Sequence, residues 1–405
     1  MKGWIANGRV VDPSTGEDQV RDVFFEEGKL VAPPADPSGW PKVDATGKVV
    51  CPGFVELHSC VASVQEAEAA VAGGFSTVLT SPANAAPIEK PSVARDLRAR
   101  LQGSPSRILI AGALTAGLKG EEIADVGSLL AAGCAVLSNG VTPVRNARVL
   151  RHLLEYAGRF RQPIHLRAAD ADLESGGVVR EGPRAAWLGL PYVPPEAEEI
   201  GITTAAALVR RTGTPVHLTH LWSARGVEAL RRAQAEGLPI TGSTTATHLF
   251  LTDAILDELA YAGVCRTIPP LGDEEDRAAL KSAVTEGRLA VAADHRPVPP
   301  EFQDREFELA QQGMLTFEMT FSMVSAALGS VAASVRALST TPAALLGQKA
   351  TLTVGAIADI AIVDPNARWT VRREALRSLR GASPLVGREL VGRVDRLWVG
   401  GVSRL

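Results

Sequence analysis

The stretch CPGFVELHSCVA, residues 51–62, is the part of the sequence that decides the fold. A proline–glycine turn leads into a short apolar run that ends on His58, which predicts a buried strand with a polar residue at its carboxyl end. Side chains along a strand repeat with a period of two, so Cys60 is expected on the same side as His58. Histidine and cysteine both bind zinc. The pattern therefore allows a metal site, although a single His-x-Cys pair is more often an ordinary strand position.

Seven further strand-like runs follow, most of them apolar, and segments with helical periodicity separate them. Eight alternations of strand and helix predict an α/β fold, a closed parallel (β/α)8 barrel of the TIM type, rather than an open sheet. Glycines that end several helical segments fit the left-handed position after a helix. The predicted strands are 53–58, 75–81, 107–114, 134–139, 163–168, 215–220, 239–245 and 289–294.

Both ends of the chain have a different pattern, in which short runs of alternating apolar and polar residues are interrupted by Gly, Asn and Pro. This predicts one small β-sandwich domain built from both termini. We expect residues 1–51 plus 346–405 to form that domain and residues 52–345 to form the barrel.

The composition excludes several classes of protein. The net charge is -3 over 405 residues, so the chain has no excess of basic residues that would favour binding to nucleic acid or to an anionic membrane. No run approaches the roughly 20 apolar residues that span a bilayer, and the N-terminus lacks the apolar region of a signal peptide. Four scattered cysteines are too few for a disulfide framework. A cytoplasmic location is expected.

Polar residues end several of the predicted barrel strands. Parallel barrels place their active sites at this carboxyl-terminal rim, so these side chains are expected to meet at one mouth. They are His58, Asn139, Arg167, His220 and Asp294.

Motifs in the same order along almost the whole chain resemble the dihydroorotase family of amidohydrolases. CPGFVELHSCVA resembles the family's PGFVDLHVHLR, and AGGFSTVLTSPAN resembles GGFTTVVDMPNT. IPPLGDEEDRAAL is similar to NPPLRSEEDREAL, and VAADHRPV to IATDHAPH. The resemblance implies an amidohydrolase barrel with a small β-sandwich. In active members it implies two zinc ions that activate water to open a cyclic amide.

The resemblance implies that the metal ligands are only partly present. His58, His220 and Asp294 fall on ligand positions, and Asp294 would also be the catalytic proton shuttle if the chain is active. Cys60 replaces the second histidine of the first strand, and Asn139 stands where the bridging acid falls. Arg167 replaces a further histidine ligand, and a guanidinium has no lone pair for a metal. A two-zinc centre is therefore expected to be lost. His165, one layer deeper on the same strand, is a poor substitute.

The implied substrate-binding positions are also changed. The arginine and the asparagine that hold the substrate carboxylate in active members fall on Ala62 and Ala83. Asn84 is one residue out of register, and two later positions carry Ile268 and Val298. No substrate-binding residue is expected.

The remaining polar residues have structural explanations. A buried Asp294 needs a partner, and a salt bridge to Arg167 across the mouth is expected. His217 and His248 are expected to be structural, His152 solvated, and Cys134 and Cys265 ordinary buried thiols.

Three hypotheses follow. The resemblance is nearest to inactive dihydroorotase-like chains that assemble with aspartate carbamoyltransferase, so the leading one is a pseudoenzyme of pyrimidine biosynthesis. It would be a homo-oligomeric scaffold without a cofactor. The second is a cyclic amidohydrolase with one zinc held by His58, Cys60, His220 and Asp294. The third is an active dihydroorotase that hydrolyses dihydroorotate to N-carbamoyl-aspartate.

Overall fold

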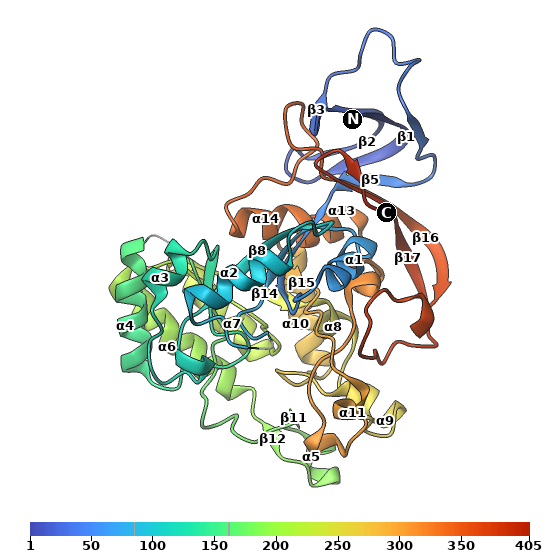
Figure 1. Ribbon diagram of the computed structural model, residues 1–405. Helices are drawn as coiled ribbons and strands as arrows, with labels where there is room; N and C mark the ends of the chain where they lie inside the picture. The colour runs from blue at the N-terminus through green and yellow to red at the C-terminus, as the bar shows by residue number, and fades with distance from the viewer. Residues whose placement is uncertain (85, 161–162) are drawn as a thin grey trace.

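Eight parallel strands wound into a barrel form the central body of the protein, as the eight strand-like runs predict (Figure 1). The computed structural model describes residues 1–84, 86–160 and 163–405. Hydrogen bonds join neighbouring strands in the order β6-β7-β8-β9-β10-β13-β14-β15. These strands are β6 (Phe54–Ser59), β7 (Phe75–Thr80), β8 (Arg107–Ala113), β9 (Val136–Ser138), β10 (Ile164–Leu166), β13 (Val216–Leu218), β14 (Ile240–Thr245) and β15 (Leu289–Ala292).

The buried carboxylate of Glu56 closes the barrel between its first and last strands. Its Oε2 accepts a hydrogen bond from Ala293 N (2.6 Å), and its Oε1 accepts one from Asp294 N (3.2 Å). The Cys60 amide adds a 2.8 Å hydrogen bond to the His295 carbonyl. A side chain therefore supplies the contacts that a regular ladder between β6 and β15 would make.

Helices after the strands pack against the outside of the barrel (Figure 1). Side-chain caps begin several of them, such as Ser63 before α1 and Ser223 before α7. Glycines with positive φ follow others, as at Gly133 (φ 86°) and Gly237 (φ 75°), which confirms the expected left-handed positions. The main helices are α1 (Val64–Ala72), α2 (Pro91–Arg100), α3 (Val126–Ala131), α4 (Ala147–Ala157), α6 (Glu196–Thr212), α7 (Ala224–Ala235), α10 (Glu274–Thr285) and α12 (Thr320–Leu328).

Short elements complete the barrel body and include a two-stranded pairing of β11 with β12. They are β11 (Val179–Arg180), α5 (Pro183–Leu188), β12 (Tyr192–Val193), α8 (Ala246–Phe250), α9 (Ile255–Glu258), α11 (Pro300–Gln303), α13 (Val331–Val335) and α14 (Thr341–Leu345).

Strands from both ends of the chain form a second, mixed eight-stranded sheet. In it β16 runs antiparallel to β5, and β5 runs parallel to β1. Alternate residues of these strands form an apolar core that includes Ile5, Val50 and Ile360. The domain limits at 51/52 and 345/346 stay a prediction. The strands are β1 (Lys2–Asp12), β2 (Glu17–Glu26), β3 (Lys29–Val31), β4 (Lys42–Asp44), β5 (Val49–Pro52), β16 (Ile360–Thr370), β17 (Glu389–Val399) and β18 (Val402–Ser403).

A buried network around His295 fastens the segment between β16 and β17 to the barrel rim. His295 Nδ1 accepts hydrogen bonds from the amides of Thr316 (3.1 Å) and Phe317 (3.3 Å). Its Nε2 lies 2.9 Å from Ser378 Oγ and 3.2 Å from Glu66 Oε2, and Ser378 Oγ donates to Glu66 at 2.7 Å. Both nitrogens of His295 are therefore engaged in holding the fold together.

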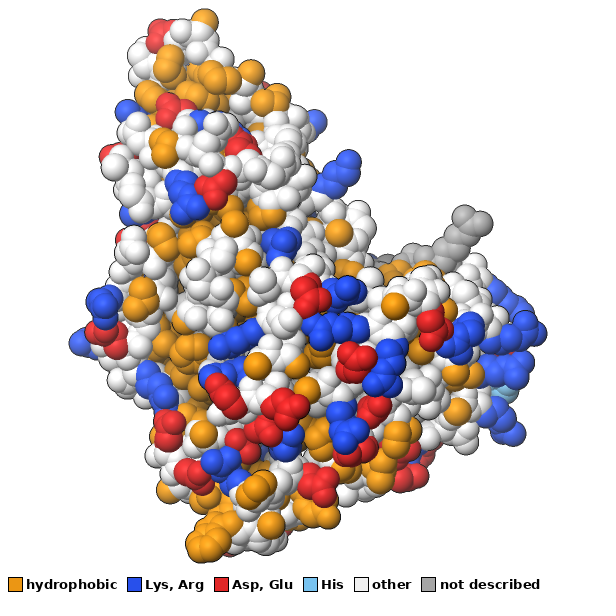
Figure 2. Space-filling view, turned by 180° about the vertical axis from the view of Figure 1, so that it is seen from behind, with side chains coloured by type: hydrophobic (Ala, Val, Ile, Leu, Met, Phe, Trp, Pro, Cys, Tyr) orange, Lys and Arg blue, Asp and Glu red, His pale blue; other side chains and the backbone are white. Residues whose placement is uncertain are grey.

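Charges of both signs are interspersed over much of the face drawn in Figure 2. Ion pairs also form between α6 and α7 and within α7, such as Arg225 with Glu196 (3.0 Å) and Arg232 with Glu228 (3.2 Å). Among the residues that the structure describes, no helix is both long and apolar enough to span a bilayer.

Candidate functional site

The polar side chains expected at the barrel mouth lie at the strand ends or just beyond them. His58 lies within β6, and Asn139 and Arg167 directly follow β9 and β10. His220 and Asp294 come two residues after β13 and β15, with φ of 56° and 50°. Left-handed backbone is uncommon outside glycine and is found at functional sites. A turn, rather than strand periodicity, therefore aims these two side chains.

Arg167 is buried in a two-pronged ion pair with Glu174. Its Nη1 and Nη2 lie 2.8 Å and 2.5 Å from the two carboxylate oxygens, and Nη1 also donates to the Val141 carbonyl (3.0 Å). Only 5% of the arginine side chain and 15% of the glutamate side chain are exposed. The expected salt bridge between Arg167 and Asp294 is therefore wrong. Glu174, in the loop after β10, supplies the carboxylate instead.

Asp294 lies between two other partners. Its Oδ1 is 3.3 Å from His220 Nε2 and 3.5 Å from Arg296 Nη2. Burial raises the pKa of Asp294, but His220 and Arg296 outweigh burial, so the net shift is downward. The carboxylate therefore has a fixed guanidinium beside it.

Arg296 is a site residue that reasoning from the sequence missed. The signal was present in VAADHRPV, residues 291–298, because the similar family motif IATDHAPH has alanine at this position. Together with Arg167, it places a second permanent positive charge at the mouth.

The side chain of Asn139 forms hydrogen bonds with the loops around it. Its Oδ1 accepts from Thr115 Oγ1 (2.6 Å), and its Nδ2 donates to the carbonyls of Thr142 (3.0 Å) and Leu118 (3.4 Å). The amide is neutral and its groups are satisfied, so it provides no bridging anion.

The positions that bind the substrate carboxylate in active members of the family have few hydrogen-bond donors in this chain. Asn84 turns back on its own segment, where Nδ2 donates to the Ser81 carbonyl (2.7 Å) and to Thr80 Oγ1 (3.3 Å). The Cys60 thiol lies 3.5 Å from the Ala83 carbonyl. Burial raises the pKa of that thiol, which favours the protonated form.

A two-metal centre does not fit these residues. Such a centre needs a bridging anion and a ligand from each of several strands. At the two changed positions the structure has a satisfied neutral amide, Asn139, and a guanidinium already paired with Glu174. The ligands His58, His220 and Asp294 remain, but the groups that would hold a second ion do not.

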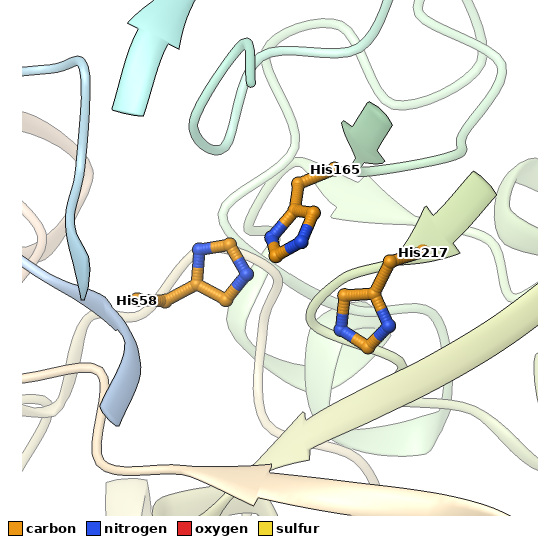
Figure 3. Close-up of side chains that lie close together, drawn as sticks. All are labelled: His58, His165 and His217. Carbon is orange, nitrogen blue, oxygen red and sulfur yellow. The ribbon is translucent and has the colours of Figure 1, made fainter. Parts of the chain in front are cut away.

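Several histidine rings lie close together in the barrel, and Figure 3 shows three of them, His58, His165 and His217. The ring centroid of His58 lies 4.6 Å from that of His220 and 5.8 Å from that of His165, and His165 lies 4.7 Å from His217. Within the described part of the chain, His58, His165 and His217 are the one group of three such side chains with donor atoms all within 4.8 Å. The structure thus gives His165 a more central place than its sequence position indicated.

Other residues singled out in the sequence lie where they were expected. His248 is buried, with Nδ1 2.8 Å from Thr245 Oγ1 and Nε2 3.1 Å from the Pro270 carbonyl, so its ring is satisfied. His152 is exposed on α4. Cys134 and Cys265 are buried, and burial raises the pKa of each to about 11.

Comparisons with known proteins agree with the resemblance. Residues 47–225 match the family described as Dihydro-orotase-like. A protein named dihydroorotase from Anaeromyxobacter dehalogenans (strain 2CP-1 / ATCC BAA-258) is 37% identical over 420 residues, 98% of this chain and 96% of the relative. A Pseudomonas aeruginosa protein named dihydroorotase-like protein is 34% identical and covers 98% of both chains. The solved L-hydantoinase from Arthrobacter aurescens is 22% identical, with a TM-score of 0.87 over 100% of this chain and 96% of that one, a likeness that shows the fold. The chain therefore belongs to the dihydroorotase-like family of amidohydrolases.

Proposed function

We propose that this chain is a dihydroorotase-like protein that does not hydrolyse dihydroorotate. The observation that carries the proposal is the buried Arg167–Glu174 pair at a metal-ligand position of the family. A guanidinium offers no lone pair and keeps its charge at any physiological pH. It would repel a cation at that position, and its own carboxylate partner stabilises it there.

The substrate side supports the same conclusion. A small substrate with a carboxylate, such as dihydroorotate, needs donors or cations aimed at that group, and a site that lacks them loses both affinity and discrimination. Ala62 and Ala83 have only methyl side chains, and Asn84 is folded back on its own turn. Val298 is buried, with 1% of its surface exposed. Binding and water activation are thus weakened by separate substitutions.

We further propose that the retained fold acts as a scaffold for aspartate carbamoyltransferase. This rests on the likeness to inactive dihydroorotase-like chains of such assemblies, together with a mouth that lacks the groups for a second metal ion while the barrel around it is intact. The proposal includes a homo-oligomeric, cytoplasmic protein that needs no catalytic cofactor.

Co-expression with the aspartate carbamoyltransferase of the same organism tests the scaffold role. A joint species on size exclusion, and transferase activity or heat resistance that falls when this chain is left out, would support it. The Anaeromyxobacter relative in place of this chain is the control for non-specific association. Separate elution, with full transferase activity in the absence of this chain, would refute the scaffold role.

The mononuclear alternative has one observation in its favour. His220 lies between His58 and Asp294, with its ring 4.6 Å from the first and its Nε2 3.3 Å from Oδ1 of the second. In this alternative these residues and Cys60 would hold one zinc ion, and Asp294 would accept a proton, although no three of them form a group with donor atoms within 4.8 Å among the described residues. This function predicts hydrolysis of some cyclic amide by the zinc-loaded protein and loss of that activity in Asp294→Asn. An active dihydroorotase, the third hypothesis, would in addition have to turn over dihydroorotate.

A further inference from the structure

Three histidines from three different strands meet in the interior of the barrel (Figure 3). His58 comes from β6, His165 from β10 and His217 from β13. His165 and His217 are direct register partners in the ladder between β10 and β13, so their side chains leave the sheet on the same face. Residues far apart in the sequence are thereby held in one small volume.

These rings contain buried nitrogen atoms without hydrogen-bond partners. His165 is fully buried, and among the described residues neither of its ring nitrogens has a partner. His58 is 4% exposed, and its Nε2 also lacks one within that part of the chain. Buried polar atoms are nearly always satisfied, so orphaned ones point to an unseen ion or water. Two neighbouring imidazoles with free nitrogens are the arrangement that a metal ion satisfies.

The third ring has partners that suit a ligand. His217 Nδ1 lies 2.9 Å from Thr241 Oγ1, and its Nε2 lies 2.9 Å from Ser243 Oγ. Metal-bound histidines usually donate their second nitrogen to a neighbouring oxygen, which fixes the ring. Either hydroxyl could keep that role while the other gives way to the ion.

The spacing of the donor atoms also suits a cation. Each imidazole offers a lone pair on the ring nitrogen that carries no proton. Donor atoms within 4.8 Å of one another can close on an ion through small ring rotations, since zinc–nitrogen bonds are about 2.0–2.1 Å.

We propose that His58, His165 and His217 form a binding site for one divalent transition-metal ion of the kind that prefers imidazole, such as zinc. The site lies one layer below the mouth and shares only His58 with the ligand positions of the family. Three ligands on β6, β10 and β13 would tie together strands that are not all neighbours. This inference does not depend on the scaffold role, because a metal in this place can be structural.

Metal titration of the full-length protein, with any affinity tag removed, tests the proposal. The protein is stripped with a chelator and titrated with Co²⁺, whose visible spectrum reports imidazole coordination, and zinc is then added in competition. We expect one equivalent to bind. His165→Ala should weaken binding at least about tenfold, since even partners outside the ligand shell change metal affinity by about 10–100-fold.

Asp294→Ala is the matched control, because Asp294 belongs to the mouth and not to the proposed site. It should leave the cobalt affinity unchanged within error. Loss of binding in Asp294→Ala, with His165→Ala unaffected, would overturn the proposal in favour of a metal at the mouth. Failure of the wild-type protein to bind would overturn it outright.

A second measurement avoids any dependence on the folding of variants. Anomalous diffraction from zinc-soaked crystals of the unmodified protein should give a peak bounded by His58, His165 and His217. A peak beside Asp294 instead, or no peak, would contradict the proposal.

Discussion

Replacing Glu174 by glutamine removes the charge that compensates the buried guanidinium of Arg167 while nearly preserving side-chain volume. Loss of one partner from a buried ion pair costs about 3–5 kcal/mol. Water can reach part of this pair, because 15% of the Glu174 side chain is exposed. We therefore expect the free energy of unfolding to fall by about 3 kcal/mol, the lower end of that range.

A double-mutant cycle separates the interaction energy of Arg167 with Glu174 from the other effects of each substitution on stability. Glu174→Gln, Arg167→Gln and the double variant are unfolded in urea and followed by circular dichroism. The double variant should be more stable than the sum of the single changes predicts, by up to about 3 kcal/mol, the range found for residues in direct contact.

Asp294→Asn paired with Arg167→Gln is the control, because Arg167 pairs with Glu174 and Asp294 with His220 and Arg296. These two substitutions should be additive within about 0.5 kcal/mol. Additive effects of the Arg167 and Glu174 substitutions, or strong coupling of Arg167 to Asp294, would refute the assignment of the pair.

Three further predictions concern the framework. Glu56→Ala should lower the free energy of unfolding in urea by at least about 3 kcal/mol, because several buried hydrogen-bond donors lose their acceptor at about 1–3 kcal/mol each. An unchanged midpoint of urea unfolding would contradict closure of the barrel by this side chain. Burial raises the pKa of Glu198 from 4.5 to about 8, so the folded state holds a proton that the unfolded chain releases. This stabilising contribution is complete below about pH 4.5 and is lost as the pH rises through about 8. Glu198→Gln should therefore reduce the slope of the free energy of unfolding against pH in this range. A slope equal to that of the wild-type protein would contradict a protonated Glu198 in the folded state. Ser378→Ala breaks the contacts with Glu66 and His295 and should speed tryptic cleavage within residues 372–388, whereas equal rates would show that the network does not hold the segment.

The fold could be predicted from the sequence because its signals are local. Each predicted run between helical segments became a barrel strand, because most of these runs are rich in the apolar residues that a strand buried on both faces needs. The exception is β14, whose sequence ITGSTT is mostly polar. The terminal sheet followed from alternating patterns and turn residues. Glycines such as Gly133 and Gly237 marked helix ends because they adopt positive φ without strain.

The site could be predicted only in part, because its partners come from loops. The sequence indicated that Arg167 cannot be a ligand, but it did not reveal Glu174, whose loop reaches back to the guanidinium. Arg296 was visible in its motif and went unnoticed. The closeness of His165 to His58 follows from the radius and stagger of the barrel, which no local pattern encodes.

The steady-state rate of dihydroorotate hydrolysis by the purified, zinc-supplemented chain tests the central claim most directly. The Anaeromyxobacter dihydroorotase serves as the positive control in the same assay, and Asp294→Asn corrects for contaminating activity. If the barrel mouth cannot catalyse hydrolysis, the rate of dihydroorotate hydrolysis by the wild-type chain will equal the rate with Asp294→Asn and the rate in buffer alone. A wild-type rate above both, abolished by Asp294→Asn, would contradict the claim and make this chain an active dihydroorotase.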